Sequence, residues 1–197
     1  MKKLLFIIIP ILILTVAGLA FAVSSNSNIN TNTNTQGELM DKKILIAYFS
    51  WGGNTKHIAE LIQKETNADI FRIETKIPYP TDYNEAAYGV AKEQHEKNIH
   101  PELKENKDVS GYDVIFVGTP AWWYEMAPVV KTFLESNNFE GKIIAPFITH
   151  GGGGKYTIKE EMAKLAKGSK VLEPFVVYGK GNSDTENEIK EWLNKIK

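Results

Sequence analysis

The chain has 197 residues, no cysteine and a formal net charge of −1. The lack of cysteine excludes disulfides, thiol chemistry, a lipid-modified N-terminal cysteine and any metal site built on cysteine. The near balance of acidic and basic residues gives no attraction to nucleic acid or to anionic lipid, so neither is an expected partner.

The first 23 residues predict an export signal or an N-terminal membrane anchor. Two lysines follow Met1, residues 4–23 are almost entirely apolar, and Ala20-Phe21-Ala22 matches the A-x-A pattern at which a signal peptidase cuts. The apolar stretch is about 20 residues long, which is also enough to span a bilayer. Cleavage and a retained anchor both remain open. In either case the domain is expected to be exported, and to be secreted or anchored to the cytoplasmic membrane.

The next segment, residues 24–40, predicts a disordered polar linker, and residues 41–197 predict one domain. Residues 24–37 are almost all serine, asparagine and threonine, which cannot bury a core. The remaining length of roughly 160 residues is that of one ordinary domain. Without residues 1–22, which hold two lysines and no acidic residue, the net charge becomes −3.

Strand-like and helix-like segments alternate through this domain. The expected strands are residues 44–49, 68–73, 112–118, 142–149 and 170–178, and the expected helices are 54–66, 83–98, 127–136, 156–167 and 184–197. This alternation predicts an α/β fold, a three-layer, doubly wound, five-stranded parallel sheet with helices on both faces. Ligands of such sheets bind beyond the carboxyl ends of the strands, so the loops after the first, third and fourth strands should share one edge.

The loop after the first strand predicts a phosphate site. It reads Ser50-Trp51-Gly52-Gly53-Asn54-Thr55 and lies between a buried strand and the start of a helix. Such a turn offers hydroxyl groups and backbone N–H donors, and the helix N-terminus adds partial positive charge. Lys56 comes next, but it is one step into the helix and is expected to point to solvent.

The loop after the third strand contains three adjacent aromatic residues, in the sequence Thr119-Pro120-Ala121-Trp122-Trp123-Tyr124. Successive residues of an extended loop point in different directions, so all three rings cannot enter one interior. Stacking of at least one ring on a flat aromatic ligand would account for them. The alternative is that one tryptophan closes the sheet edge while the other packs under the second helix.

The loop after the fourth strand reads His150-Gly151-Gly152-Gly153-Gly154. Consecutive glycines allow positive φ angles and a close approach of the backbone to a ligand. A flexible connector is the alternative interpretation. The position of this loop on the same sheet edge as the other two favours a role in ligand binding.

These three segments together resemble the landmarks of the flavodoxin family, in particular exported or stand-alone bacterial members with a Pro-x-Trp-Trp loop. The resemblance covers residues 43–197 and implies the strand order 2-1-3-4-5 with FMN as the cofactor. It also implies that the first loop holds the FMN phosphate, that the second lines the ribityl chain and the flavin ring, and that the third approaches the opposite edge of the ring. The implied cofactor-binding residues are Ser50, Trp51, Gly52, Gly53, Asn54, Thr55, Thr119, Pro120, Ala121, Trp122, Trp123, His150, Gly151, Gly152 and Gly153.

Two features depart from the family pattern. Flavodoxins are commonly strongly acidic, whereas a charge of −3 is weak, so docking of a partner through a broad negative field is doubtful. His150 stands where the family often has a small or hydroxyl residue; it could make a flavin potential depend on pH or simply face water. Tyr79 and Tyr83, in the loop after the second strand, could cover the flavin or serve in packing.

Other polar residues carry no signal for metal binding or acid–base catalysis. His57, His95 and His100 share no metal-ligand spacing and are expected at the surface. Glu160 and Glu161 are expected to form a solvated helix face. We therefore predict neither a metal site nor a catalytic residue.

The predicted function is that of an FMN-binding electron carrier outside the cytoplasmic membrane. It would act as a monomer or weak dimer and would exchange electrons with a protein partner or a small acceptor. The main alternative is a flavin-dependent NAD(P)H:quinone-type reductase of the same fold. A binding module that kept the fold and lost the flavin is a third possibility, but it would need a broken phosphate turn.

Overall fold

The structure, a computed structural model, describes residues 42–196. The strands are β1 (Ile44–Tyr48), β2 (Asp69–Arg72), β3 (Val114–Trp122), β4 (Glu125–Met126), β5 (Ile143–His150), β6 (Lys170–Val171) and β7 (Phe175–Tyr178). The helices are α2 (Asn54–Thr66), the π-helix η1 (Glu85–Ala91), α3 (Lys92–Glu96), α4 (Pro128–Glu135), α5 (Ile158–Leu165) and α6 (Thr185–Lys195). The expected signal or anchor (1–23) and linker (24–40) lie outside the described residues.

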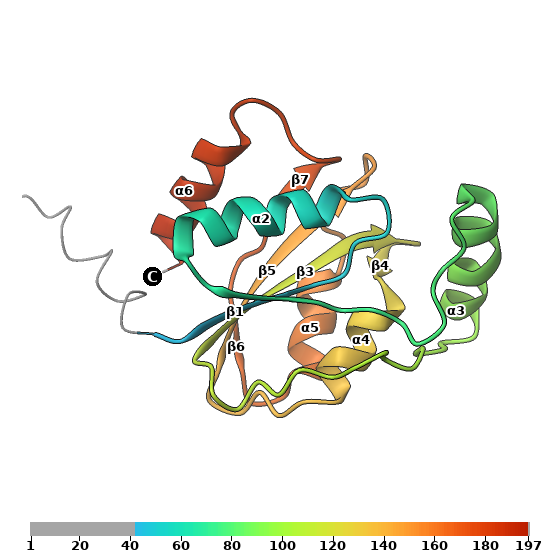
Figure 1. The fold of residues 1–197 in the computed structure, drawn as a ribbon, viewed down its shortest axis with the longest axis horizontal. Coiled ribbons are helices and arrows are strands. Elements are labelled where there is room, and N and C mark those ends of the chain that lie inside the picture. The colour runs from blue at the N-terminus through green and yellow to red at the C-terminus, as the bar shows by residue number, and fades with distance from the viewer. Residues whose placement is uncertain (1–41, 197) are drawn as a thin grey trace, which may run out of the picture. The chain divides into compact units, whose positions relative to one another are not determined.

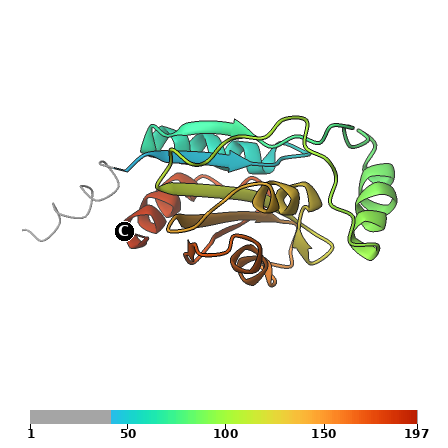
Figure 2. The same ribbon diagram turned by 90° about the horizontal axis from the view of Figure 1, so that it is seen from below.

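The sheet confirms the predicted fold class and strand order. Its strands run β2-β1-β3-β5-β6, with β7 beside β5, and all of these neighbours are parallel. Helices α2 and α6 cover one face, and α4 and α5 cover the other (Figures 1 and 2). Strands β3 and β4 pair antiparallel, and Thr75 and Leu103 form an isolated antiparallel bridge. Within residues 42–196, no helix has the length and apolar character needed to cross a membrane.

Strand residues are buried on both faces of the sheet, which explains why the strands are continuous apolar runs. Leu45 packs under α4 and α5, whereas its neighbour Ile46 packs under α2 and α6, because side chains alternate along a strand. Phe133 of α4 and Ile58 of α2 are completely buried against these two faces. Each such side chain contributes about 1.5–3 kcal/mol through loss of contact with water.

Three expected elements have different bounds. The predicted strand 170–178 is divided into β6 and β7. Ile144 of β5 pairs with Val171 and Phe147 pairs with Phe175, so the edge strand has one residue more than β5 between these two pairs. The extra residue makes a bulge, and Pro174 lies within it, where a missing N–H is tolerated. The predicted helix 83–98 contains a π-helix over Glu85–Ala91 and ends as an α-helix over Lys92–Glu96. Strand β3 continues four residues beyond its predicted end because it pairs first with β5 and then with β4.

Gly118 provides a test of the packing between the central strands. It lies in one row with Tyr48 of β1 and Phe147 of β5. A methyl group on Gly118 would overlap the Phe147 ring and lie 2.8 Å from Tyr48 Cβ. We expect Gly118→Ala to lower the free energy of unfolding by about 3 kcal/mol through overpacking, as measured by urea denaturation.

The matched control is Gly89→Ala, because a methyl group there meets open space within a helical segment. This control should leave stability unchanged or raise it by about 0.5–1 kcal/mol. Equal effects of the two substitutions would show that the row at Gly118 is not tightly packed.

Candidate functional site

The turn after β1 is closed by its own first hydroxyl. Gly53 has a φ of 90°, which an L-residue with a side chain rarely adopts, and its N–H donates to Ser50 Oγ at 3.1 Å. Ser50 is only 2% exposed, so this hydroxyl lies inside the turn. The carbonyl oxygen of Ser50 accepts a hydrogen bond from the Arg72 guanidinium at 3.2 Å. The turn is thus shaped from within by a hydroxyl and from β2 by a cation.

The N-terminus of α2 presents unpaired donors. The first intrahelical bond runs from the N–H of His57 to Gly53 O at 3.0 Å, and α2 has no side-chain cap and no acidic residue in its first turn. The backbone N–H groups of Asn54, Thr55 and Lys56 have no acceptor among residues 42–196. Free N–H groups and the helix dipole favour an anion at this position. The Lys56 ammonium contacts Glu60 at 3.6 Å along the helix.

A buried hydroxyl pair joins this turn to the end of β5. Thr55 Oγ1 lies 2.9 Å from Thr149 Oγ1, and the two residues are 1% and 2% exposed. Thr149 immediately precedes His150, so the start of α2 lies beside the glycine loop. The first and third predicted loops are therefore brought together, 94 positions apart in the sequence.

A cavity of about 310 Å³ lies between the loop after β3 and the loop after β5. We call it the aromatic cavity; its lining residues are Tyr83, Ala87, Tyr88, Ala91, Ala121, Trp122, Trp123, Tyr124, His150, Gly151, Gly153 and Tyr156. None of these described lining residues is Asp, Glu, Lys or Arg. The walls therefore suit a flat, uncharged ring better than a charged group.

Both tryptophans line this cavity and also pack against the protein. Trp122 meets Phe49 and Tyr79 edge-on, with centroid distances of 5.4 and 5.0 Å. The indole N–H of Trp123 donates to Ala87 O at 2.8 Å, and its ring lies 5.7 Å from that of Tyr88. Ring stacking on a ligand and packing are thus compatible roles, because each indole has a covered side and a cavity side.

The two-residue loop between β3 and β4 is strained. Trp122 pairs with Glu125, so Trp123 and Tyr124 are its central residues, and their φ angles are 47° and 71°. Two positive φ angles define a type I′ turn, in which asparagine and glycine are preferred. A residue with a side chain costs about 1–2 kcal/mol in the left-handed region. The surrounding contacts must therefore hold this conformation.

Charged side chains lie directly beneath that loop and form what we call the ion cluster: Glu125, Lys131, Glu161 and His95. Lys131 Nζ is 2.6 Å from Glu125 Oε2 and 3.9 Å from Glu161 Oε2, and the Lys131 side chain is only 12% exposed. Glu161 also accepts the Met126 N–H at 3.4 Å. His95 Nδ1 is 3.3 Å from Glu125 Oε2 but is not aligned for a hydrogen bond.

The two carboxyl groups of the ion cluster respond to burial differently. Burial raises the pKa of Glu161, and the nearby Lys131 ammonium only partly offsets this effect. Burial also acts to raise the pKa of Glu125, but the hydrogen bond and charge of Lys131, together with His95, lower it overall. Lys131 is thus shared unequally and pairs chiefly with Glu125.

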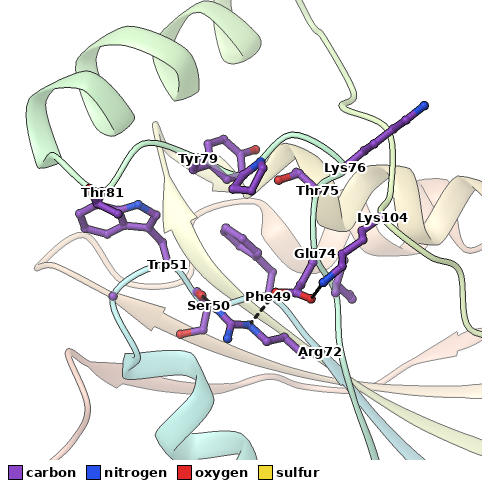
Figure 3. Close-up of a pocket in the computed structure, with 13 residues that line it drawn as sticks. Phe49, Ser50, Trp51, Arg72, Glu74, Thr75, Lys76, Tyr79, Thr81 and Lys104 are labelled. Atoms are coloured by element: carbon purple, nitrogen blue, oxygen red, sulfur yellow. Dashed lines mark hydrogen bonds and ion pairs between the residues drawn. The ribbon is translucent and has the colours of Figure 1, made fainter.

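A second cavity, of about 530 Å³, lies over β2 on the other side of the turn (Figure 3). We call it the charged groove. Arg72, Lys76 and Lys104 line it together with Glu74, which contacts Lys104 at 3.0 Å and Arg72 at 3.9 Å. Tyr79 also lines the groove; its hydroxyl donates to Gln94 at 2.7 Å, and burial raises its pKa.

The structure distributes the predicted site residues over three places. Ser50, Trp51 and Gly52 line the charged groove; Ala121, Trp122, Trp123, His150, Gly151 and Gly153 line the aromatic cavity; Gly53, Asn54 and Thr55 form the start of α2. The Thr119 hydroxyl is fully buried and accepts the Ala127 N–H at 3.0 Å, which fixes the start of α4. Pro120 pairs with Thr149. Gly152 donates its N–H to His150 Nδ1 at 3.0 Å.

Several residues at the site were not identified from the sequence. Glu161 is half-buried rather than part of a solvated face, although its spacing with Ile158, Met162 and Leu165 puts it on the apolar face of α5, a detectable signal. His95 likewise lies partly buried beside Trp123 rather than at the surface. Tyr88 had no sequence signal. Among the described residues, no group of acidic and histidine side chains could hold a metal ion.

Comparisons with known proteins agree with this geometry. A family model described as Flavodoxin matches residues 43–196. A structure from Bacteroides eggerthii assigned as a flavoprotein is 28% identical, with a TM-score of 0.68 over 79% of this chain and 98% of its own. A flavoprotein of Lactobacillus acidophilus in complex with FMN is 26% identical, with a TM-score of 0.58 over 75% of this chain and 97% of its own.

Among curated proteins, Flavodoxin 1 of Salmonella typhimurium is 28% identical over 100 residues. That match covers 48% of this chain and 42% of the relative, so the chain spans less than half the length of this curated protein. The parallel sheet with its loops at one carboxyl edge defines a doubly wound α/β protein of the kind that binds ligands there. The chain belongs to the flavodoxin family.

The Thr55–Thr149 pair allows a direct test of the link between the loops. Thr149→Val keeps the shape of the side chain but leaves the buried Thr55 hydroxyl without this partner. We expect a loss of about 1–3 kcal/mol in the free energy of unfolding, measured in urea. The double variant Thr55→Val/Thr149→Val should recover most of the loss, because no unpaired hydroxyl remains. A double variant as unstable as the sum of the single variants would contradict the pairing.

Proposed function

We propose that the protein binds FMN at the carboxyl edge of its sheet and transfers electrons outside the cytoplasmic membrane. FMN is the cofactor of the family to which the chain belongs. The observation that carries the proposal is the pairing of an aromatic cavity without charged lining residues with a helix N-terminus whose first N–H groups are unpaired. When bound, FMN supplies one- or two-electron chemistry at its ring.

The phosphate of FMN fits the turn at residues 50–55. Unpaired N–H groups of α2 and the hydroxyls of Ser50 and Thr55 provide donors, and no acidic side chain occupies the first turn of the helix. These donors can hold a dianion without a direct cation. Lys56 is turned to Glu60, and Arg72 acts on the carbonyl of Ser50, so both influence the phosphate from a distance.

The flavin ring fits the aromatic cavity. Residues 119–123 would line one side of the ring and residues 150–153 the other, as the family resemblance implies. Beside the wall, the ammonium of Lys131 is paired with the carboxylate of Glu125 and lies near that of Glu161. Its positive charge is therefore not free to stabilise an anionic reduced ring, which favours a low reduction potential.

The proposed place of action follows from the N-terminal sequence. The basic start, the apolar stretch and the A-x-A pattern support export, with the domain secreted or held at the membrane. The weak net charge after removal of the leader argues against a partner that docks mainly through basic residues. A protein partner or a small electron acceptor remains compatible with the exposed tyrosines around the cavity, such as Tyr124 at 65% exposure.

The charged groove is the observation that favours a second candidate, an NAD(P)H:quinone-type reductase. Its cations Arg72, Lys76 and Lys104 lie beside the phosphate turn and could face the phosphates of a dinucleotide. All three are already engaged: Lys76 contacts Glu102 at 2.6 Å, and Arg72 and Lys104 both contact Glu74. Steady-state oxidation of NADPH with a quinone acceptor separates the candidates, because a carrier shows negligible turnover.

Titration of the purified protein with FMN and with riboflavin tests the proposed site. We expect stoichiometric FMN binding with quenched flavin fluorescence and, because riboflavin lacks the phosphate, at least a hundredfold weaker binding of riboflavin. Thr55→Val removes one hydroxyl donor beside the phosphate and should weaken FMN binding about tenfold to a hundredfold. Riboflavin binding should weaken less, because only the loss of the Thr55–Thr149 contact affects it.

The matched control for this titration is Lys56→Ala at the neighbouring position, which should change FMN affinity less than about threefold because Lys56 already faces Glu60. Failure to take up FMN would overturn the proposed function. Equal affinity for FMN and riboflavin would overturn the assignment of the phosphate to residues 50–55.

A further inference from the structure

The loop that carries Trp123 and Tyr124 has no conformational preference of its own for the shape that it adopts. Both residues have positive φ angles, and neither is the asparagine or glycine that a type I′ turn favours. Tyr124 is 65% exposed, so burial of its ring cannot hold it there. Within the turn, the indole N–H of Trp123 bonds Ala87 O, so the rest of the hold on the hairpin of β3 and β4 must come from contacts outside the turn.

Two helices supply those contacts through the strand β4. Lys131 of α4 binds the Glu125 carboxylate at 2.6 Å, and Glu161 of α5 accepts the backbone N–H of Met126 at 3.4 Å. These are the only two residues of β4, so each is tied to a different helix. Lys131 Nζ also lies 3.9 Å from Glu161 Oε2, which connects the two ties.

The side chains of Lys131 and Glu161 are buried more deeply than those of an ordinary surface ion pair. The Lys131 side chain is 12% exposed and that of Glu161 is 20% exposed, whereas the ion pairs elsewhere on α5 and α6 involve more exposed lysines, such as Lys190 at 45%. A buried pair is weak evidence for added stability, but removing one partner leaves an uncompensated charge and disturbs the local structure. Buried pairs of this kind are better known for specifying one local conformation than for adding stability, and here that conformation is the one of the β3–β4 hairpin.

We propose that Lys131 and Glu161 are positioning residues for the flavin site: they clamp β4 and thereby hold Trp122 and Trp123 in the wall of the aromatic cavity. This inference rests on the proposed FMN site, but it concerns how the wall is held, and its direct consequence is visible without FMN. Neither residue lines the cavity, so both act through the hairpin.

Lys131→Met tests the clamp, because it keeps an unbranched side chain, shorter by one atom, and removes its charge. In the FMN-free protein we expect a changed near-ultraviolet circular dichroism of the tryptophans, since the hairpin loses one of its ties. In the complex we expect an FMN dissociation constant about tenfold higher or more, with altered visible dichroism of the bound flavin. Lys131→Arg keeps the charge and should show the tryptophan dichroism and the FMN dissociation constant of the unmodified protein. The matched control, Lys164→Met, removes the same charge from an exposed position on α5 and should change neither.

A double-mutant cycle shows whether Lys131 acts through the strained turn. Tyr124→Gly places at this position the residue that a positive φ favours. It also removes a ring that lines the aromatic cavity and contacts Tyr156, so the effect of Lys131→Met is measured within each background. In that background the clamp is less needed, so Lys131→Met should raise the FMN dissociation constant by about threefold or less. An equal effect in both backgrounds would overturn the inference, because Lys131 would then act by its charge alone.

The outcomes separate this inference from the proposed function. Lack of FMN binding by the unmodified protein removes the proposed function, and the tryptophan dichroism of the FMN-free Lys131→Met protein still decides whether the clamp exists. Tight FMN binding with unchanged dichroism in Lys131→Met overturns the clamp alone.

If Lys131→Met does not fold, Glu161→Gln replaces it. That change keeps an acceptor for Met126 and removes only charge, and we expect effects in the same direction of about threefold.

Discussion

The parallel register of β1, β3 and β5 is the constraint on which the whole site depends. Tyr48, Gly118 and Phe147 stand in one row across the three strands, so the strands end at the same level and their loops leave the sheet together. Because the strands are parallel, all of their carboxyl ends lie at the same end of the sheet, and the loops that leave them gather there. The helices then carry the chain back to the other end, where the next strand begins. The buried Thr55–Thr149 pair then fixes the start of α2 against the end of β5.

Around that edge the protein separates an uncharged region from a charged one. The aromatic cavity has no acidic residue, lysine or arginine among its described lining residues, whereas the adjacent groove has four. Tyr79 stands between them, because it lines the groove and packs edge-on against Trp122 of the cavity. Burying a charge next to aromatic walls is costly, so the aromatic cavity favours an uncharged ring and excludes a charged group.

Hydrophobic pattern predicted the fold well, because each strand of a doubly covered sheet must be apolar throughout and each helix must be apolar on one face. It failed where pairing partners decide the outcome. Strand β3 extends through Trp122 because β5 and β4 provide hydrogen bonds there, and the last strand divides because an extra residue must be absorbed near Pro174. The residues of β3 give no sign of the first cause; Pro174 is a local sign of the second, but the register with β5 decides where the bulge lies.

The sequence by itself determined the fold class and the three loops, and through them the family and its cofactor. Periodicity and the glycine- and hydroxyl-rich turn at residues 50–55 are local properties that need no partner. Only the tertiary structure decided that Glu161 and Lys131 meet beneath the hairpin, and that Trp123 and Tyr124 adopt positive φ angles. Those features depend on which helices pack beside one another, and a buried charge or a strained turn persists only where distant parts of the chain compensate for it.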